Sequence, residues 1–304
     1  MRVTLSTGIC LCAIFFATCR DVSINNNSGD VETPPCVDCP IDFALIDYEP
    51  AWSPDGNTIA YIHGDTSLEK TGIYFMSSDG SNSRMFFSST TANSPEWSPD
   101  GKWIAFEMKA NVYKIRSDGD SLIQLTTQGR NYYPSWSRDG ENISYDSNLL
   151  NSVGGYNIWV MGKNGDHKRM VVAGRMSNLF NSGNMLYIGF HAEIYRSDIN
   201  NGIATKQLTF LNQTNIYTSD SRFPKYSPDG TKIAFSAQPD GGFFQICAID
   251  SDGSNFRQLT NTQGYSFAWS PNGDYIVYTD SRGVNGRLWM MNRDGSNKRQ
   301  ITFK

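Results

Sequence analysis

Six copies of one short motif divide the chain at nearly regular intervals. Five copies read Trp-Ser-Pro-Asp-Gly or a close variant, and a degenerate sixth ends at Gly183 with Leu179 and Ser182 in place of Trp and Asp. By subtraction of their positions, successive final glycines are 39 to 47 residues apart, the length of a four-stranded propeller blade. The sequence therefore predicts an all-β fold, a six-bladed β-propeller of four-stranded antiparallel blades. The five clear copies are Trp52–Gly56, Trp97–Gly101, Trp136–Gly140, Tyr226–Gly230 and Trp269–Gly273.

Apolar strands follow each copy in a constant order. A second strand comes directly after the motif, as at 58–61 and 103–106, and a third follows a variable loop, as at 73–76 and 112–115. A second turn then closes on a glycine, and four blades end in Gln-Leu-Thr or Gln-Ile-Thr, at residues 124–126, 207–209, 258–260 and 300–302. Residues 41–45 could add a fifth strand to the first blade or share the closing blade.

Each residue of the motif has a physical role in the turn or in packing. Pro presets φ, Asp can bond its own backbone, and Gly takes a left-handed corner, so Ser-Pro-Asp-Gly predicts a tight hairpin turn. The aromatic ring before the turn supplies a large flat surface to pack between neighbouring blades. We therefore expect Trp97 and Trp136 to be largely buried. The structural aromatic positions are Trp52, Trp97, Trp136, Tyr226 and Trp269.

From about Tyr48 to Thr302 these motifs resemble the TolB-like propeller family, whose unit is the WD40-like PD40 repeat. The resemblance implies a six-bladed propeller, a fold shared by TolB and by propeller domains of some peptidases. TolB carries an α/β domain ahead of its propeller, and residues 20–47 are too short for one. We therefore expect a TolB-like protein that is not TolB itself. The fold alone does not fix function, because binding modules and enzymes share it.

The N-terminus carries an export signal. Arg2 is followed by an apolar stretch, which predicts a signal peptide over residues 1–18. The segment Phe16-Ala17-Thr18-Cys19 resembles a bacterial lipobox, so we expect lipidation of Cys19, with ordinary cleavage as the alternative. We expect residues 19–40 to form a lipidated flexible tether and residues 41–304 the propeller. The predicted localisation is the bacterial cell envelope, as a lipoprotein that faces either the periplasm or the cell exterior.

The tether contains a lone pair of cysteines, Cys36 and Cys39, between Pro35 and Pro40. In an oxidising compartment this pair can be a local disulfide, a redox pair or half of a metal site, and we favour the disulfide. Cys247 lies in an apolar strand and is expected to be a buried free thiol.

Composition and charge limit the classes of binding partner that we expect. The formal net charge of −4 offers no electrostatic basis for binding nucleic acid. No apolar run reaches the roughly 20 residues that span a bilayer, so membrane contact is expected only through the lipid anchor.

Catalytic motifs are missing from the sequence. It contains neither Gly-x-Ser-x-Gly nor His-Glu-x-x-His, and its three histidines (His63, His167 and His191) are expected in or near loops as ordinary surface residues. The repeated Asp55, Asp100, Asp139 and Asp229 are best explained as turn residues, so we predict no catalytic residue, metal site or cofactor.

Long polar and aromatic loops are the strongest functional lead. In a propeller, the loops between the second and third strands and those between blades gather on one face, around the channel mouth. Aromatic and Arg side chains there are typical binding anchors. The candidate binding-face residues are Tyr132, Tyr133, Asp146, Tyr217, Asp220, Arg222, Phe243, Phe244, Asp280 and Arg282. We expect a binding or scaffolding protein for an envelope protein or peptide. The alternatives are a lyase or lactonase with a channel metal, and a carbohydrate-binding protein.

Overall fold

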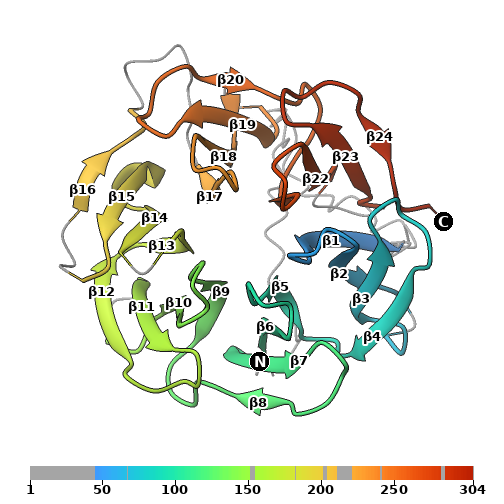
Figure 1. The fold of residues 1–304 in the computed structure, drawn as a ribbon, viewed down its shortest axis with the longest axis horizontal. Helices are drawn as coiled ribbons and strands as arrows, with labels where there is room; N and C mark the ends of the chain where they lie inside the picture. The colour runs from blue at the N-terminus through green and yellow to red at the C-terminus, as the bar shows by residue number, and fades with distance from the viewer. Residues whose placement is uncertain are drawn as a thin grey trace, which may run out of the picture. The chain divides into compact units, whose positions relative to one another are not determined.

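Each copy of the repeat folds into one four-stranded antiparallel sheet, which confirms the predicted six-bladed propeller. The computed structural model describes residues 45–66, 68–150, 155–181, 183–200, 204–210, 221–239, 242–281 and 285–303. Six sheets, here called blades 1 to 6 in chain order, stand around a central axis (Figure 1). The first strand of each blade lies nearest the axis and the fourth lies outermost (Figure 1).

All four strands of every blade are consecutive in the chain. Blades 1 to 3 contain β1 (Ile46–Trp52), β2 (Thr58–Gly64), β3 (Gly72–Ser77), β4 (Arg84–Ser88), β5 (Asn93–Trp97), β6 (Trp103–Met108), β7 (Asn111–Arg116), β8 (Ile123–Gln124), β9 (Asn131–Trp136), β10 (Asn142–Ser147), β11 (Asn157–Gly162) and β12 (Arg169–Ala173). Blades 4 to 6 contain β13 (Arg175–Leu179), β14 (Asn184–Ile188), β15 (Ile194–Asp198), β16 (Ala204–Gln207), β17 (Arg222–Tyr226), β18 (Lys232–Ala237), β19 (Gln245–Asp250), β20 (Arg257–Gln258), β21 (Phe267–Trp269), β22 (Tyr275–Thr279), β23 (Leu288–Asn292) and β24 (Arg299–Gln300).

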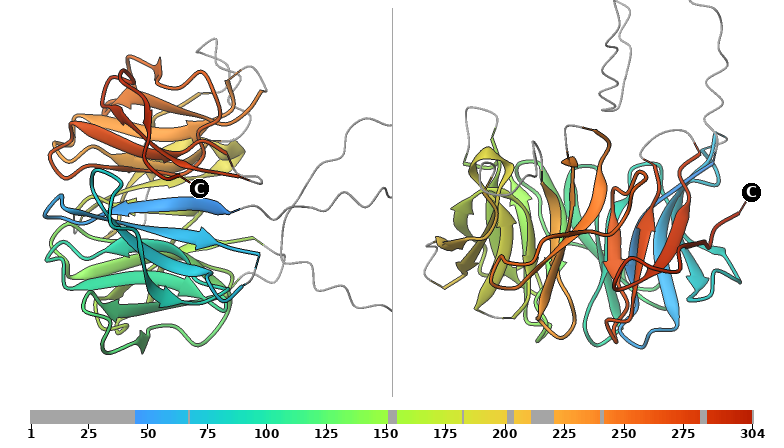
Figure 2. Two further views of the ribbon diagram at one scale, coloured as in Figure 1. Left: turned by 90° about the vertical axis from the view of Figure 1, so that its right-hand side faces the viewer. Right: turned by 90° about the horizontal axis from the view of Figure 1, so that it is seen from above.

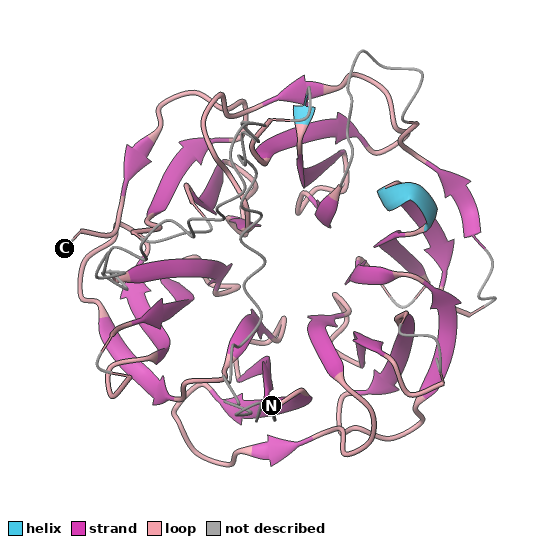
Figure 3. Cartoon of the chain, turned by 180° about the vertical axis from the view of Figure 1, so that it is seen from behind, coloured by secondary structure: helices cyan, strands magenta, loops and turns pink. Residues whose placement is uncertain are grey.

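The strands run between two faces of the ring (Figure 2). The tight turns that join first to second and third to fourth strands lie on one face, which we call the turn face. The loops between second and third strands and between blades lie on the other, the loop face. Nearly all of the described chain is strand or loop, apart from short 3₁₀ turns such as the one at Phe190–Ala192 (Figure 3). No helix in the described ranges has the length and apolar content needed to cross a bilayer.

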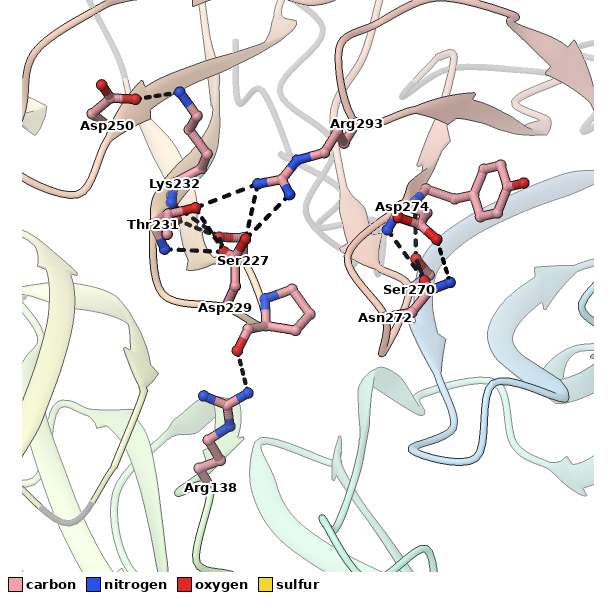
Figure 4. Close-up of polar contacts among 12 residues, drawn as sticks. Arg138, Ser227, Asp229, Thr231, Lys232, Asp250, Ser270, Asn272, Asp274 and Arg293 are labelled. Atoms are coloured by element: carbon pink, nitrogen blue, oxygen red, sulfur yellow. Dashed lines mark hydrogen bonds and ion pairs between the residues drawn. The ribbon is translucent and has the colours of Figure 1, made fainter.

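Each first turn is held by its own side chains. In blade 1 the Ser53 hydroxyl donates to Asp55 Oδ1 at 2.6 Å, and the Asn57 N–H donates to the same oxygen at 3.0 Å. These hydrogen bonds, chiefly the one from Ser53, lower the pKa of Asp55. Figure 4 shows the same arrangement around Asp229 in blade 5. The Asp residues of the motif therefore serve the turn.

Blade 4 keeps this chemistry without the motif. The Asn181 side-chain oxygen accepts the N–H groups of Gly183 and Asn184 at 3.0 and 2.7 Å. Leu179 is buried in the place of the Trp, and Ser182 lies outside the described residues.

The second turn and the Gln-Leu-Thr ending join neighbouring blades. The Thr hydroxyl accepts an N–H near the start of its own third strand, as in Ile246 N–H to Thr260 Oγ1 at 3.0 Å. The turn glycine of the next blade packs on the residue before that Thr. A Cβ added to Gly295, where φ is +87°, would lie 2.7 Å from the Leu259 carbonyl oxygen. Glycine is therefore required by both conformation and space.

The hydrophobic core lies between the blades. It consists of six clusters of buried side chains, and each combines residues from two adjacent sheets. One such cluster packs Ile62, Ile73 and Phe75 of blade 1 against Ile104 and Phe106 of blade 2. Every sheet is thus covered on both faces, which explains its run of apolar and β-branched residues.

The repeat aromatics differ in burial. Trp136 and Trp269 are buried, at 5% and 8% exposure, whereas Trp52, Trp97 and Tyr226 are half-buried. The Trp97 indole still reaches across a blade junction, where its N–H donates to the Ala51 carbonyl at 3.2 Å. The expectation of deep burial therefore fits Trp136 better than Trp97, whose ring lies at the turn-face end of β5.

The ring closes by packing of blade 1 against blade 6. Blade 6 takes its four strands from residues 267–300, and Leu45 lies outside any strand. Residues 41–44 of the expected extra strand lie outside the described residues. Two backbone N–H groups of β1 donate across the junction, from Asp47 to the Gly286 carbonyl and from Glu49 to Ser266 Oγ, both at 3.0 Å.

Candidate functional site

A bulge interrupts the first strand in five blades, at the same place in each. The residues at the bulge have φ between 50° and 53° without being glycine; they are Glu49, Ser94, Tyr133, Met176 and Phe223. Pairing with the second strand shifts register at these points. A bulge re-aims its backbone and side chain, and such strained conformations gather at functional sites.

The bulge N–H groups bond to the preceding blade. Ser94 N–H donates to Glu49 Oε2 at 2.6 Å, and Met176 N–H donates to both carboxylate oxygens of Asp146 at 2.8 and 3.0 Å. Tyr133 N–H donates to Glu107 Oε2 at 3.3 Å. Three carboxyl groups, from blades 1, 2 and 3, thus accept hydrogen bonds from the bulges of blades 2, 3 and 4.

Two of these carboxyl groups have raised pKa values. Burial, and then the nearby charge of Glu49, raise the pKa of Glu107 to about 8. Burial also raises the pKa of Asp146 to about 8, although the Met176 N–H and the charge of Arg175 act in the opposite direction. Burial, followed by the charges of Glu49 and Glu107, raises the pKa of the Tyr133 hydroxyl as well.

Below the mouth, polar side chains from four blades cross the channel. Lys225 Nζ lies 3.4 Å from Glu96 Oε2, although the two residues are 129 positions apart. Ser135 Oγ donates to Glu96 Oε1 at 3.2 Å, and Asn178 Nδ2 donates to Ser135 Oγ at 3.4 Å. The cavity among these side chains has room for several water-sized groups, with about 60 Å³ open to their centres.

A row of aromatic rings extends over the mouth. Successive ring centroids are 5.3 to 6.4 Å apart along Tyr156, Tyr132, Tyr133, Phe223, Tyr265 and Phe244. Four of the five contacts are edge-to-face. We call these six residues the aromatic row; they come from the ends of blades 3, 5 and 6.

One arginine is bound into the row. Arg222 Nη1 donates to the Tyr265 hydroxyl at 2.6 Å, and its guanidinium lies 4.6 Å from the centroid of the Phe244 ring. Phe243, next to this stack, is 68% exposed. An exposed ring beside a fixed aromatic and Arg platform is typical of a protein-binding surface.

The predicted binding-face residues fall into three groups. Tyr132, Tyr133, Arg222 and Phe244 come together, with Phe243 adjacent. Asp146 is buried beneath the surface. Asp280 accepts hydrogen bonds from Arg287 N–H and Trp289 Nε1 at 2.8 Å each. Both carboxyl groups therefore hold structural elements together. Tyr217, Asp220 and Arg282 lie outside the described residues, as do Cys19, Cys36 and Cys39.

The histidines lie apart on different elements. His63 is the next-to-last residue of β2, near the loop that follows, and its Nδ1 is 2.7 Å from Asp47 Oδ1. His191 is in the 3₁₀ turn of blade 4, and His167 is exposed on the turn face of blade 3. Within the described ranges, no three His, Cys, Asp or Glu side chains are grouped to hold a metal ion. Cys247 is buried and free, and burial raises the pKa of its thiol to about 12.

Sequence reasoning missed Tyr156, Phe223, Tyr265 and the polar residues of the channel. A signal for some of them is present, because Pro precedes the repeat aromatic by two positions in four blades, at Pro50, Pro95, Pro134 and Pro224. The residue before that Pro is the bulge residue, and the residue after it is Glu96, Ser135 or Lys225 in three blades. This shorter motif marks the channel lining.

Residues 41–182 and 179–304 match the family model of the TolB beta propeller domain. Among solved structures, TolB from Acinetobacter baumannii is 25% identical with a TM-score of 0.65. The match covers 84% of this chain and 63% of that one, so the similarity spans less than two thirds of that TolB.

Two enzymes have the same propeller fold at lower identity. The tricorn protease is 15% identical with a TM-score of 0.64, over 85% of this chain and 26% of that one. Oligogalacturonate lyase in complex with manganese is 10% identical with a TM-score of 0.58, over 84% of this chain and 77% of that one. At these identities the similarity concerns the fold alone.

Proposed function

This chain belongs to the TolB β-propeller family, and from that premise we propose that it is an exported binding protein of the bacterial cell envelope. It recognises a protein or peptide at the loop face, over the mouth of the channel. The aromatic row with Arg222 is the observation that carries this proposal, since it forms a fixed platform beside the exposed Phe243.

The geometry of the channel supports binding at the mouth. The Lys225–Glu96 pair bridges the channel below the row. The strained bulges meanwhile hold Tyr133 and Phe223 in place over the channel. A partner would therefore lie on the aromatic row, where preorganised rings reduce the entropy lost on binding.

The binding prediction can be tested with two exposed aromatics on opposite faces. Phe243→Ala removes a loop-face ring that is 68% exposed, and we expect it to weaken capture of the partner from envelope extract at least tenfold. Tyr275→Ala removes a ring that is 42% exposed on the turn face and serves as the control. Capture would be measured by pull-down with both variants checked for folding by circular dichroism. Equal capture by the two variants would contradict binding at the loop face.

The anchor is a separate part of the proposal. Lipidation of Cys19 would attach the protein to a membrane surface, because each buried CH₂ of an acyl chain contributes roughly 0.8 kcal/mol. We expect Cys19→Ala to release the protein from the membrane fraction or to leave uncleaved precursor. Cys36→Ala is the matched control, and it should stay with the membrane. A wild-type protein that is soluble and begins at another residue would contradict the anchor.

A further inference from the structure

A second cavity, of about 210 Å³, opens between blades 5 and 6 on the turn face, away from the aromatic row. Its floor is apolar and consists of Ala248, Ile249, Leu259 and Trp269. Its rim carries three cationic side chains, Lys232, Arg257 and Arg293, together with Asn255 and Asp294.

Two of the cations are already paired. Lys232 Nζ contacts Asp250 Oδ1, and the Arg293 guanidinium lies 3.1 Å from Asp229 Oδ2 across the blade junction (Figure 4). The one rim carboxylate is also engaged, because Asp294 Oδ1 accepts the N–H and the hydroxyl of Ser296 at 2.9 and 2.6 Å. The Arg257 side chain makes no hydrogen bond or close ion pair with any described residue, although its charge helps to lower the pKa of Asp250.

The repeat provides an internal comparison for these three positions. Lys232 begins its second strand, Arg257 precedes the Gln of its outer strand, and the N–H of Arg293 bonds back to the first turn of its own blade. The equivalent residues at the other junctions are Thr58, Arg84 and Ser117; Trp103, Ile123 and Lys163; Asn142, Arg169 and Ile199; Asn184, Lys206 and Ser251; and Tyr275, Arg299 and Ser78. Each of those sets holds one cation, whereas the junction of blades 5 and 6 holds three.

The equivalents of Arg257 also behave differently. Arg169 Nη1 donates to the Ile199 carbonyl at 2.7 Å, and Lys206 Nζ donates to the Asp252 carbonyl. Both side chains therefore cross to the second turn of the next blade. At the junction of blades 5 and 6 the cavity lies in that place, and Arg257 lines it without reaching the turn that contains Asp294.

We propose that this cavity is a binding site for a small organic anion with an apolar body, such as an aromatic phosphate or carboxylate. The apolar floor would take the ring, and Arg257 would bind the anionic group with its planar set of donors. Lys232 and Arg293 add N–H donors at the rim, while their own acids hold them in place. The site is independent of the loop face and of the partner proposed for it.

Phenyl phosphate is a suitable probe, titrated by calorimetry into the purified protein at one fixed ionic strength. We expect saturable binding, weakened at least tenfold by Arg257→Gln. The matched control is Arg299→Gln, which changes the equivalent residue of blade 6, whose guanidinium lies against Met290 Sδ at 3.4 Å. That variant should bind within twofold of the wild type.

Phenol and inorganic phosphate test the contributions of the apolar floor and of Arg257 separately. Each should bind at least tenfold more weakly than phenyl phosphate if both floor and arginine contribute. Equal binding by the two arginine variants would overturn the proposal, as would no saturable binding by the wild type. Inorganic phosphate that binds as tightly as phenyl phosphate would overturn the assignment of the apolar floor.

Discussion

At the scale of single residues, the loop face contains carboxyl groups that are partly protonated at neutral pH. Asp146 is buried, and its carboxyl bonds the bulge N–H of the next blade, so its ionisation is coupled to the junction of blades 3 and 4. The turn carboxyls behave in the opposite way, since hydrogen bonds such as that from Ser53 lower the pKa of Asp55. The two sets therefore act on stability in different ranges of pH.

The direction in which the ionisation of Asp146 changes stability follows from the coupling between proton binding and folding. The folded state keeps a proton on this carboxyl that the unfolded chain releases near its ordinary value of 3.8, so stability should fall as the pH rises toward 8. We expect the free energy of unfolding to fall by at least about 1.4 kcal/mol, the equivalent of one pKa unit, between about pH 5 and 8. Urea unfolding at a series of pH values would measure this.

Two variants distinguish the effect of Asp146 on the pH dependence of stability from that of the turn carboxyl Asp55. Asp146→Asn should flatten the decline in stability between about pH 5 and 8, because the titrating group is removed. Asp55→Asn should lower stability by a similar amount throughout this range and leave the decline unchanged, because the lowered pKa of Asp55 makes its contribution pH-dependent only below the ordinary pKa of Asp. A decline that persists in Asp146→Asn would assign the effect to other groups, Glu107 first.

At the scale of elements, the third-to-fourth-strand turns fix the spacing between blades. Gly80 and Gly119 have nearly the same φ, +96° and +95°, but different surroundings. A Cβ at Gly80 would lie 2.4 Å from the Ile301 carbonyl oxygen of blade 6, whereas at Gly119 the nearest atom is Phe86 Cε2 at 3.9 Å. Substitutions at Gly119 and Gly80 therefore distinguish the energetic cost of a positive φ from the cost of steric contact with the neighbouring blade.

We expect Gly119→Ala to destabilise the protein by about 1–2 kcal/mol through its positive φ alone. Gly80→Ala should add a further 1–3 kcal/mol, roughly, because blade 6 has to move. Chemical denaturation of both variants checks this. Equal losses would mean that the turn adjusts without disturbing the junction.

At the scale of the whole molecule, a buried charged contact joins blades 6 and 1, where the ring closes. Arg287 and Asp47 are 7% and 6% exposed at their side chains, and Arg287 Nη1 lies 3.9 Å from Asp47 Oδ2 while also donating to the Leu45 carbonyl. The Arg293–Asp229 pair, by contrast, joins blades 5 and 6 at 38% and 45% exposure. Burial should make the closing contact the more important of the two.

Removing one member of a buried pair leaves a charge without compensation. We expect Arg287→Leu to lower the free energy of unfolding by roughly 3 kcal/mol, the low end for a buried pair, because His63 still contacts Asp47. Arg293→Ser, the control at an exposed pair, should cost less than about 1 kcal/mol. Thermal and urea unfolding would compare the two. A small loss in Arg287→Leu would show that apolar packing closes the ring.

The sequence by itself determined the class of fold, the number of blades and the positions of the five first turns that carry the clear motif. The turns form through contacts between residues that are close in sequence. The fixed period of strands and turns can likewise be recognised without knowing which distant residues meet. The same locality explains how Tyr132, Tyr133, Arg222 and Phe244 could be assigned to one face.

Tertiary structure decided which of those side chains meet. Glu96 and Lys225, or Tyr133 and Phe223, become neighbours only when curvature brings the first strands of six blades to one axis. Burial of Asp146, and the cavity beside Arg257, depend likewise on how closely two sheets approach each other. That distance is set by the packing of side chains from both blades together, and no single repeat contains it.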